Sequence, residues 1–478
     1  MKTPEKVAVI DIGKTNAKVV VLDCQTGREI SECRTPNRVL AGPPYPHYDI
    51  DALWDFILVS LSALARDIGF DAISITTHGA SAALVDEKGA LALPVLDYEH
   101  HYPDAIQQVY TMLRPPFSET FSPALSGGLN VGAQLHYQKS AFPNVFARVR
   151  TILTYPQYWA FRLTGIAATE VTSLGCHTDL WRPRDGDYSS LVEALAIRDL
   201  MAPIRSAFDA IGTVRPDIAE RISLAAPVPV HCGIHDSNAS LLSHLIGREP
   251  PFAVVSTGTW VINFAVGGDL DHLDPARDTL ANVDAYGRAV PSSRFMGGRE
   301  FEMLTSELGP LEQQAALAVM PGVIARRIML LPNLAEGSGP YPGRPARWLG
   351  EAHASNAERW AAACLYLALM TQTCLKLIGA GGPVLVEGPF AHNRVYLDAL
   401  AALVGRDVLA LPGSTGTSQG AALLAGIRPA SGSEISISPS DIDGLQAYAD
   451  IWRDLARPAV PSMPVRDADL SPVSPPPR

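Results

Sequence analysis

The chain lacks the basic excess that marks proteins binding nucleic acid. It has 38 lysines and arginines against 49 aspartates and glutamates, a formal net charge of −11. Binding to phosphate backbones normally needs a positive patch or stripe. We therefore expect no nucleic-acid partner.

Cysteine is also scarce, with six residues and no Cys-x-x-Cys pair. Disulfide frameworks and zinc sites are usually recognised by closely spaced cysteines. Scattered cysteines in apolar surroundings indicate buried, reduced thiols of a cytosolic protein. The six are Cys24, Cys33, Cys176, Cys232, Cys364 and Cys374.

Long apolar runs are absent as well. No uninterrupted run approaches the roughly 20 residues that cross a bilayer, and the first residues lack the basic and apolar regions of a signal peptide. We expect a cytoplasmic protein without a membrane partner.

The chain is long and apolar enough for more than one domain. Its 478 residues, 47% of them hydrophobic, with a mean hydropathy of +0.10, can fill the cores of two or three domains.

Two similar hairpins are the most informative feature that the chain does have. Residues 7–23 and 252–263 each contain two apolar strands joined by a turn rich in Gly, Thr, Asn or Ser. Backbone N–H groups and hydroxyls at two facing tips can hold a polyphosphate between them. Ordinary hairpins without a ligand are the alternative, but the repetition favours nucleotide-dependent phosphoryl transfer.

Two carboxylates stand next to these hairpins. Asp11 ends the apolar run of the first one, where a carboxylate is a poor strand residue unless it has a partner, a metal or ordered water. Asp236 follows the glycine turn at Gly233 and begins a predicted helix, just before the second hairpin. Helix capping alone could explain it, but its position makes Asp236 a candidate base.

A polar cluster follows the first α/β unit. Helical periodicity over 51–67 and a buried strand over 72–77 predict that unit, after a Pro-rich connection, 35–48, without regular structure. Polar residues after the strand, and after a hairpin through 86–89, lie where ligand crevices form in α/β proteins; a solvated loop is the alternative. They include Thr77, His78, Gly79, Ser81, Asp97 and Tyr98.

The second half predicts a sheet covered by helices. A capping box at Ser355 and Glu358 opens a long helix to about residue 378. Strands 384–387 and 408–411 then flank a helix over 393–404, and a loop from 412 opens another helix. An aromatic-rich helix around 155–165 is predicted earlier in the chain, and residues 465–478 are predicted to be disordered.

With this order of motifs, the chain resembles the FGGY carbohydrate kinases over roughly residues 6–455. The motifs are a first phosphate hairpin, a sugar-contacting segment, Gly-x-x-Asp, a second phosphate hairpin and an adenosine segment. The pattern Asp11-x-Gly13-x-Thr15-Asn16-x-Lys18, together with segment 75–86, is most similar to the fuculokinase and rhamnulokinase members.

The resemblance implies an α/β fold of two actin-like (ribonuclease-H-like) domains with the active site in the cleft between them. Residues 1–240 would form the sugar-binding domain, 241–456 the nucleotide-binding domain, and 457–478 a Pro-rich tail. The implied reaction transfers phosphate from ATP, with Mg²⁺, to a terminal hydroxyl of a ketose. A deoxyketose of the L-fuculose or L-rhamnulose kind, giving the 1-phosphate, is the expected small-molecule substrate, and a homodimer is possible.

The resemblance also implies residue roles. Asp236 would be the catalytic base, and Asp11 would hold Mg²⁺ through water. An exposed strand lysine is the alternative for Lys18. The implied ATP and phosphate contacts are Gly13, Lys14, Thr15, Asn16, Lys18, Thr257, Gly258, Thr259, Gly388, Asn393, Thr417 and Gln419, with the loop from Thr415. The implied substrate contacts are Thr77, His78, Gly79, Ser81, Asp97, Tyr98, Gln157 and Asp236.

Departures from the family pattern keep alternatives open. His78 and Ser81 replace an aromatic residue and an acid of the relatives, which favours a kinase of another ketose or polyol: xylulose, ribulose, erythritol, a tetrulose or glycerol. Gly388-Pro389-Phe390 replaces a Gly-Gly pair against the nucleotide. An actin-like ATP-binding switch protein is the alternative from another class, and intact Asp11 and Asp236 argue against a silent sugar sensor.

Overall fold

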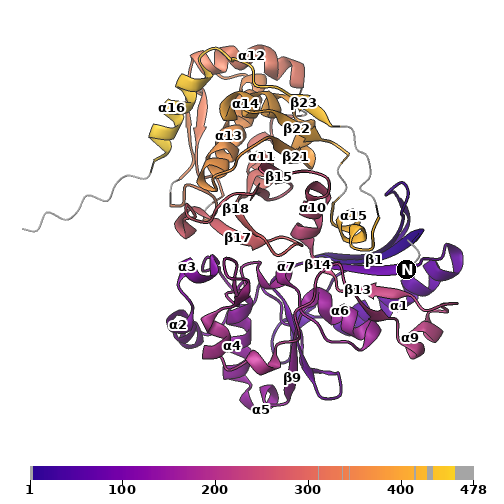
Figure 1. Ribbon diagram of the computed structural model, residues 1–478. Helices are drawn as coiled ribbons and strands as arrows, with labels where there is room; N and C mark the ends of the chain where they lie inside the picture. The colour runs from indigo at the N-terminus through magenta and orange to yellow at the C-terminus, as the bar shows by residue number, and fades with distance from the viewer. Residues whose placement is uncertain are drawn as a thin grey trace, which may run out of the picture.

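The computed structural model describes residues 4–309, 312–335, 337–343, 345–413, 416–427 and 434–457. Figure 1 shows two lobes, one from each half of the chain, with α10 (Asp236–Leu245) and α15 (Gly416–Leu423) where they meet. Each lobe contains a sheet and helices, so the predicted α/β class is confirmed. Thr415 and the segment 465–478 lie outside the described residues.

The first sheet is built on the first predicted hairpin. β1 pairs antiparallel with β2 and parallel with β6, and the strand order is β12-β13-β6-β1-β2-β3, with β14 also on β6. The central strands β1 and β6 are buried almost throughout because both of their faces are covered. The strands are β1 (Lys6–Ile12), β2 (Asn16–Asp23), β3 (Glu29–Pro36), β6 (Ala72–Thr77), β12 (Ala210–Thr213), β13 (Pro229–His231) and β14 (Ile234–His235).

The second sheet repeats this pattern around the second hairpin. β15 pairs antiparallel with β16 and parallel with β21, in the order β17-β18-β16-β15-β21-β22-β23. The two hairpins therefore occupy equivalent places in two similar sheets. The strands are β15 (Phe252–Thr257), β16 (Val261–Val266), β17 (Thr279–Val283), β18 (Ala289–Phe295), β21 (Val384–Glu387), β22 (Val408–Leu411) and β23 (Ile435–Ile437).

Smaller sheets extend the first lobe. β7 (Ala82–Asp86) pairs with β8 (Leu91–Leu93) and β9 (Val149–Thr154), which confirms the predicted hairpin through 86–89. The prediction of no regular structure over 35–48 is wrong at its ends. β3 runs to Pro36, and β4 (Val39–Leu40) pairs with β5 (His47–Tyr48), because Pro43, Pro44 and Pro46 lie in the bend between these two strands.

The main helices lie close to their predicted positions. α13 has both hydrogen bonds of the predicted capping box, and Gly165 ends α6 in the left-handed conformation. The main helices are α1 (Ile50–Asp67), α2 (Asp104–Leu113), α4 (Val131–Ala141), α6 (Tyr155–Thr164), α11 (Gly297–Thr305), α12 (Gln313–Ala325), α13 (Asn356–Leu377), α14 (Arg394–Val404) and α16 (Leu445–Ala456). Short helices are α3 (Phe117–Thr120), α5 (Pro143–Phe146), α7 (Val171–Leu174), α8 (Ser190–Ala194) and α9 (Pro216–Arg221).

Among the described residues, α13 is the one helix long and apolar enough to cross a membrane by length and composition. However, 89% of its most apolar stretch is buried inside the protein. A helix that is apolar all round and enclosed by other elements is typical of a protein core.

The two lobes share an apolar core where α10 and α15 cross. A Cβ atom built on Gly420 would lie 1.7 Å from the carbonyl oxygen of Ala239, so the two helices approach more closely than a side chain at position 420 would permit. The Ser74 hydroxyl donates to the carbonyl of Ala421 at 2.6 Å. His244 Nε2 lies 2.8 Å from Glu387 Oε2 in the second sheet. The two crossing helices therefore hold the first and second sheets together.

The lobes also meet along the edge strand β17. The Ala281 N–H donates to the carbonyl of Phe121 at 3.0 Å, and a Cβ on Gly175 would lie 2.3 Å from the side chain of Val283. Arg184 pairs with Asp271 across the same junction. The two lobes are thus in direct contact along β17 as well as at the crossing.

Replacing Gly420 by Ala tests the helix crossing. We expect a loss of about 1–3 kcal/mol in unfolding free energy, because the added methyl group overpacks a rigid backbone contact. Gly322→Ala is the matched control: Gly322 is also helical, and nothing lies within 4 Å of the position that a Cβ would take there. At this position the change should be neutral or stabilise by up to about 1 kcal/mol. Equal denaturation midpoints for the two variants would contradict the close crossing.

Candidate active site

Asp11 lies at the end of β1 with its carboxylate bound from the other half of the chain. The hydroxyls of Thr417 and Ser418 both donate to Asp11 Oδ2 at 2.6 Å. Lys18, the cross-strand partner of Asp11 in β2, has its ammonium 3.9 Å from the same oxygen and 3.3 Å from Glu29. Burial raises the pKa of Asp11 above its ordinary value, the two hydroxyls and Lys18 oppose that rise, and the charge of Asp236 adds to it.

Asp236 is the first residue of α10, where the helix dipole favours a carboxylate. Its Oδ1 accepts from the N–H of Ser237 at 2.6 Å and lies 3.0 Å from His235 Nε2. Desolvation would raise the pKa of Asp236, but the His235 charge and hydrogen bond outweigh it and lower the pKa. Asp236 is therefore held as a carboxylate, with 29% of its side chain exposed.

His235 is buried in a polar cluster. Its Nε2 also lies 3.8 Å from the Cys176 sulfur, and its Nδ1 lies 3.2 Å from Asn238 Nδ2. Burial would lower the pKa of His235, but Cys176 and Asp236 raise it well above its ordinary value. Gly79 allows this placement, because a Cβ there would lie 2.8 Å from His235 Nε2. Gly79, which was predicted to contact substrate, thus makes room for His235, the residue next to the candidate base.

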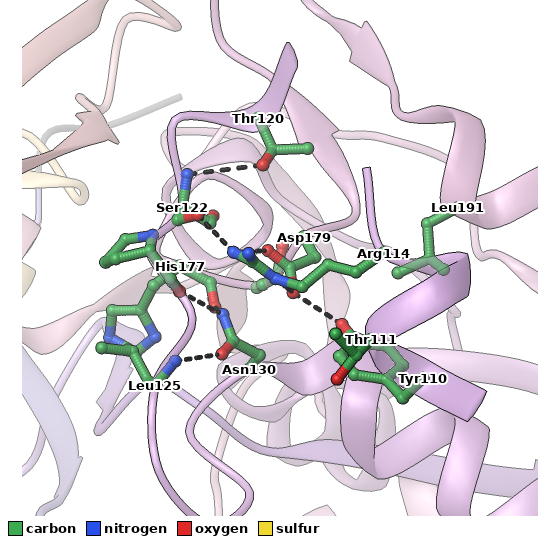
Figure 2. A network of polar contacts seen from close by, with 12 residues as sticks. Tyr110, Thr111, Arg114, Thr120, Ser122, Leu125, Asn130, His177, Asp179 and Leu191 are labelled. Carbon is green, nitrogen blue, oxygen red and sulfur yellow. Dashed lines mark hydrogen bonds and ion pairs between the residues drawn. The ribbon is translucent and has the colours of Figure 1, made fainter. Parts of the chain in front are cut away.

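A buried network supports the segment that carries Cys176 (Figure 2). Arg114 donates to both carboxylate oxygens of Asp179 at 2.9 Å, and the Tyr110 hydroxyl donates to the same group at 2.6 Å. Asn130 donates to the carbonyl of His177 at 2.9 Å. The Asp179 side chain is fully buried, so this network fixes the backbone that follows Cys176 in the chain.

Aromatic rings surround His78 at the end of β6. Its ring centroid lies 5.0 Å from that of Tyr48, 5.5 Å from Tyr98 and 4.9 Å from Tyr155. His78 Nδ1 lies 2.8 Å from the carbonyl of Gly79, whereas Nε2 has no protein partner although the residue is only 5% exposed. The buried hydroxyl of Ser81 also has no protein partner. These two groups are available to a polar ligand.

The Lys14 side chain lies beside residues that were predicted to contact substrate. The sequence had predicted that Lys14 contacts phosphate. Its ammonium pairs with Asp97, lies 3.5 Å from Glu99 Oε2, and stands 4.5 Å from the centre of the Tyr98 ring. Asp97 also accepts from the Tyr48 hydroxyl at 3.4 Å. The structure therefore joins a lysine of the first hairpin to the predicted sugar-contacting segment.

Several side chains predicted to contact ATP are occupied by protein contacts. The Thr257 hydroxyl donates to the carbonyl of Glu387 at 2.5 Å and accepts from the N–H of Phe390 at 3.1 Å. Asn393 is buried and caps α14 by accepting from the N–H of Tyr396. As described above, the Thr417 hydroxyl binds Asp11. The polar side-chain atoms of these three residues are therefore engaged by other protein groups.

The tips of both hairpins remain accessible. Thr15 and Asn16 are exposed in the first, Gly258 and Thr259 in the second, and Gly13 and Gln419 are partly exposed. Gly388 has a φ of 79°, and a Cβ there would lie 2.0 Å from the Thr257 carbonyl, so only glycine fits. The backbone at these tips is free of side-chain cover, as phosphate binding requires.

Two predicted substrate residues lie behind the site. Gln157 is fully buried, and its Nε2 donates to the carbonyls of Cys232 and Gly233 at 3.0 Å. It therefore supports the glycine turn before Asp236, which differs from the expected contact with substrate. The Thr77 hydroxyl donates to the carbonyl of His78 at 2.9 Å and is also buried.

A pocket of about 400 Å³ lies between the two lobes. One wall is the 123–129 segment, and the other includes Trp260, at the tip of the second hairpin, with Arg294 5.1 Å from its ring. The sequence did not single out Trp260 or Arg294 as site residues, nor His235 and Cys176, whereas Ser418 lies in the loop from Thr415 to Gln419 expected to contact the nucleotide. The His-Asp dipeptide at the predicted helix start was the one signal that could have indicated His235.

Two family models cover most of the chain: the FGGY family of carbohydrate kinases, N-terminal domain, over residues 7–243, and carbohydrate kinase FGGY, C-terminal domain, over residues 249–433. This chain belongs to the FGGY family of carbohydrate kinases. The predicted family and fold are thereby confirmed.

Solved and curated members give the degree of similarity. A carbohydrate kinase from Novosphingobium aromaticivorans is 40% identical, with a TM-score of 0.87, over 94% of this chain and 98% of that one. L-Fuculokinase from Salmonella typhi is 27% identical over 55% of this chain and 57% of its own length. Rhamnulokinase from Halalkalibacterium halodurans is 23% identical over 52% and 54%. The chain thus matches just over half the length of these two curated relatives.

FGGY kinases use ATP, and the residues here fit a nucleotide together with a divalent cation. Among the described residues there is no group of three or more His, Cys, Asp or Glu side chains that could hold a metal ion. Mg²⁺ commonly uses one or two carboxylates together with waters and substrate phosphates. Asp11, whose pKa is raised by burial and by the charge of Asp236, gains from a nearby cation. Its water-mediated contact with Mg²⁺ stays a prediction.

The Cys176 thiol gives a spectroscopic test of the buried polar cluster around His235. Burial raises its pKa, but the charges of His177 and His235 outweigh burial and lower it to about 5. We expect thiolate absorbance at 240 nm to appear on raising the pH through this region, below the ordinary thiol range. The difference between wild type and Cys176→Ser isolates the signal, and His235→Gln should move the midpoint upward. A midpoint in the ordinary range, unaffected by His235→Gln, would contradict the arrangement.

Proposed function

We propose that this FGGY kinase transfers the γ-phosphoryl group of ATP to a terminal hydroxyl of a ketose. The observation that carries the proposal is the placement of Asp236 close enough for its charge to raise the pKa of Asp11, beside two accessible hairpin tips. Bound Mg-ATP would supply the phosphoryl group and neutralise its charge. Asp11 and the tips at Gly13–Asn16 and Gly258–Thr259 would hold it.

Asp236 accepts the proton of the attacking hydroxyl. His235 keeps Asp236 ionised, and the N–H of Ser237 fixes one of its carboxylate oxygens at 2.6 Å. Phosphoryl transfer depends more on positioning and charge than on base strength. A carboxylate with a lowered pKa is therefore adequate, provided that it is held rigidly where the hydroxyl enters.

A deoxyketose of the L-fuculose or L-rhamnulose kind, phosphorylated at the 1-position, is the substrate we propose. The curated relatives named L-fuculokinase and rhamnulokinase support this class. The rings of Tyr48, Tyr98 and Tyr155 around His78 add an apolar wall suited to sugar C–H faces and a methyl group. Another ketose is the second candidate, because His78 and Ser81 give this pocket polar groups that differ from the fuculokinase pattern.

We further propose a domain division after α10, which ends at Leu245. A division between residues 240 and 241 would cut this helix. A cytoplasmic location and a homodimer stay predictions.

Asp236→Asn tests the proposed base. The change keeps the shape and removes the charge, so we expect kcat with ATP and the preferred ketose to fall about 10²- to 10⁴-fold. The KM for ATP should change little. L-Fuculose, L-rhamnulose and D-xylulose are compared by coupled ADP release.

Asp104→Asn is the matched control, since Asp104 is an exposed aspartate at the first position of α2. It should keep wild-type turnover. Near-normal turnover of a folded Asp236→Asn variant would exclude Asp236 as the base. A wild-type enzyme that released ADP independently of every sugar would refute the kinase assignment.

A further inference from the structure

The Lys14 side chain links the first hairpin to the segment predicted to contact the sugar. Lys14 follows the turn glycine of the first hairpin, whose neighbours Thr15 and Asn16 are exposed. Its own ammonium instead pairs with Asp97, 83 residues further along the chain. Only 22% of the lysine side chain and 9% of the aspartate side chain are exposed. The pair is thus largely shielded from solvent. Charge-assisted contacts are strong in such a shielded place.

The surroundings of the pair are acidic and aromatic. Glu99 Oε2 lies 3.5 Å from the ammonium, so two carboxylates face one cation. The ring centres of Tyr98 and Tyr48 lie 4.5 and 5.2 Å from the ammonium. A cation held over aromatic faces between two carboxylates gives the local cluster a net charge of about −1 at neutral pH.

The same cluster lies within electrostatic range of the candidate base. Burial is the main cause that lowers the pKa of His78, to about 4, while the charge of Asp236 raises it and that of Lys14 lowers it. The Tyr98 ring packs on His78 and over Lys14. The charges of Lys14 and Asp236 therefore both reach His78, against which the Tyr98 ring packs.

We propose that Lys14 is a specificity-determining residue of the sugar site, which together with Asp97 binds hydroxyls of an uncharged ketose and excludes sugar acids. The inference rests on the proposed kinase function and deepens it by naming the class of substrate. It also gives Lys14 a sugar-binding role in place of the phosphate contact expected from the sequence.

The chemistry of the pair favours neutral hydroxyls. An ammonium only donates and a carboxylate only accepts, whereas a hydroxyl does both, so adjacent hydroxyls can bridge the two groups. A sugar carboxylate would have to displace Asp97 and Glu99 from the one cation and then face Asp236. Like-charge contacts of this kind select against an unwanted ligand.

Lys14→Met separates the sugar role from a phosphate role. We expect the KM for the preferred ketose to rise about 10- to 100-fold, the range for losing a hydrogen bond to a charged group, with little change in the KM for ATP. Lys88→Met is the matched control, because Lys88 is an exposed lysine in another hairpin turn. A Lys14→Met variant that raised the KM for ATP alone would overturn the inference.

Removing the competing carboxylates gives the converse test. In the Asp97→Asn, Glu99→Gln double variant, Lys14 has lost both acidic partners, so D-gluconate should bind at least about tenfold more tightly than to wild type. Calorimetric titration without nucleotide measures this independently of turnover. Adding Lys14→Met to the double variant should abolish the gain. Tight gluconate binding by wild type, or no gain in the double variant, would overturn the inference.

The two proposals fail in different ways. A wild-type enzyme that phosphorylates none of the ketoses refutes the proposed function. An enzyme that phosphorylates a ketose, but whose sugar KM is insensitive to Lys14→Met, refutes only the role of Lys14.

Discussion

The close crossing of α10 and α15 is the constraint on which the site depends. Gly420 permits a backbone contact with Ala239 that any side chain would prevent. The first helix begins at Asp236, and the second carries Thr417 and Ser418 in its first turn. Because the helices cross only three or four residues from these starts, the candidate base and the hydroxyls that bind Asp11 come from distant parts of the chain to one place.

Electrostatics then distinguish the two carboxylates. Asp11 is buried, with its pKa raised, and stands to gain from a cation, whereas the adjacent His235 lowers the pKa of Asp236 and keeps it ionised. Two similar side chains thus acquire different chemical properties from their surroundings. This separation suits the proposed kinase reaction, in which one carboxylate would support the metal and the other would meet the incoming hydroxyl.

Local signals in the sequence were sufficient to predict the main helices and strands. The hairpins, the capping box at Ser355 and the glycine turn before Asp236 all depend on neighbours within a few residues, and the structure contains each of them. The directions of polar side chains could not be predicted in this way. Thr257 bonds a carbonyl 130 residues away and Lys14 a carboxylate 83 residues away, so their roles depend on tertiary contacts.

In the proposed reaction, Asp236 meets the sugar hydroxyl where the two hairpin tips hold the phosphates. The most direct measurement is a crystal structure with the preferred ketose, Mg²⁺ and a non-hydrolysable ATP analogue. We predict the terminal hydroxyl within hydrogen-bond distance of Asp236 and facing the γ-phosphorus. A ketose bound with that hydroxyl turned away from Asp236, or a triphosphate bound away from both tips, would contradict the account.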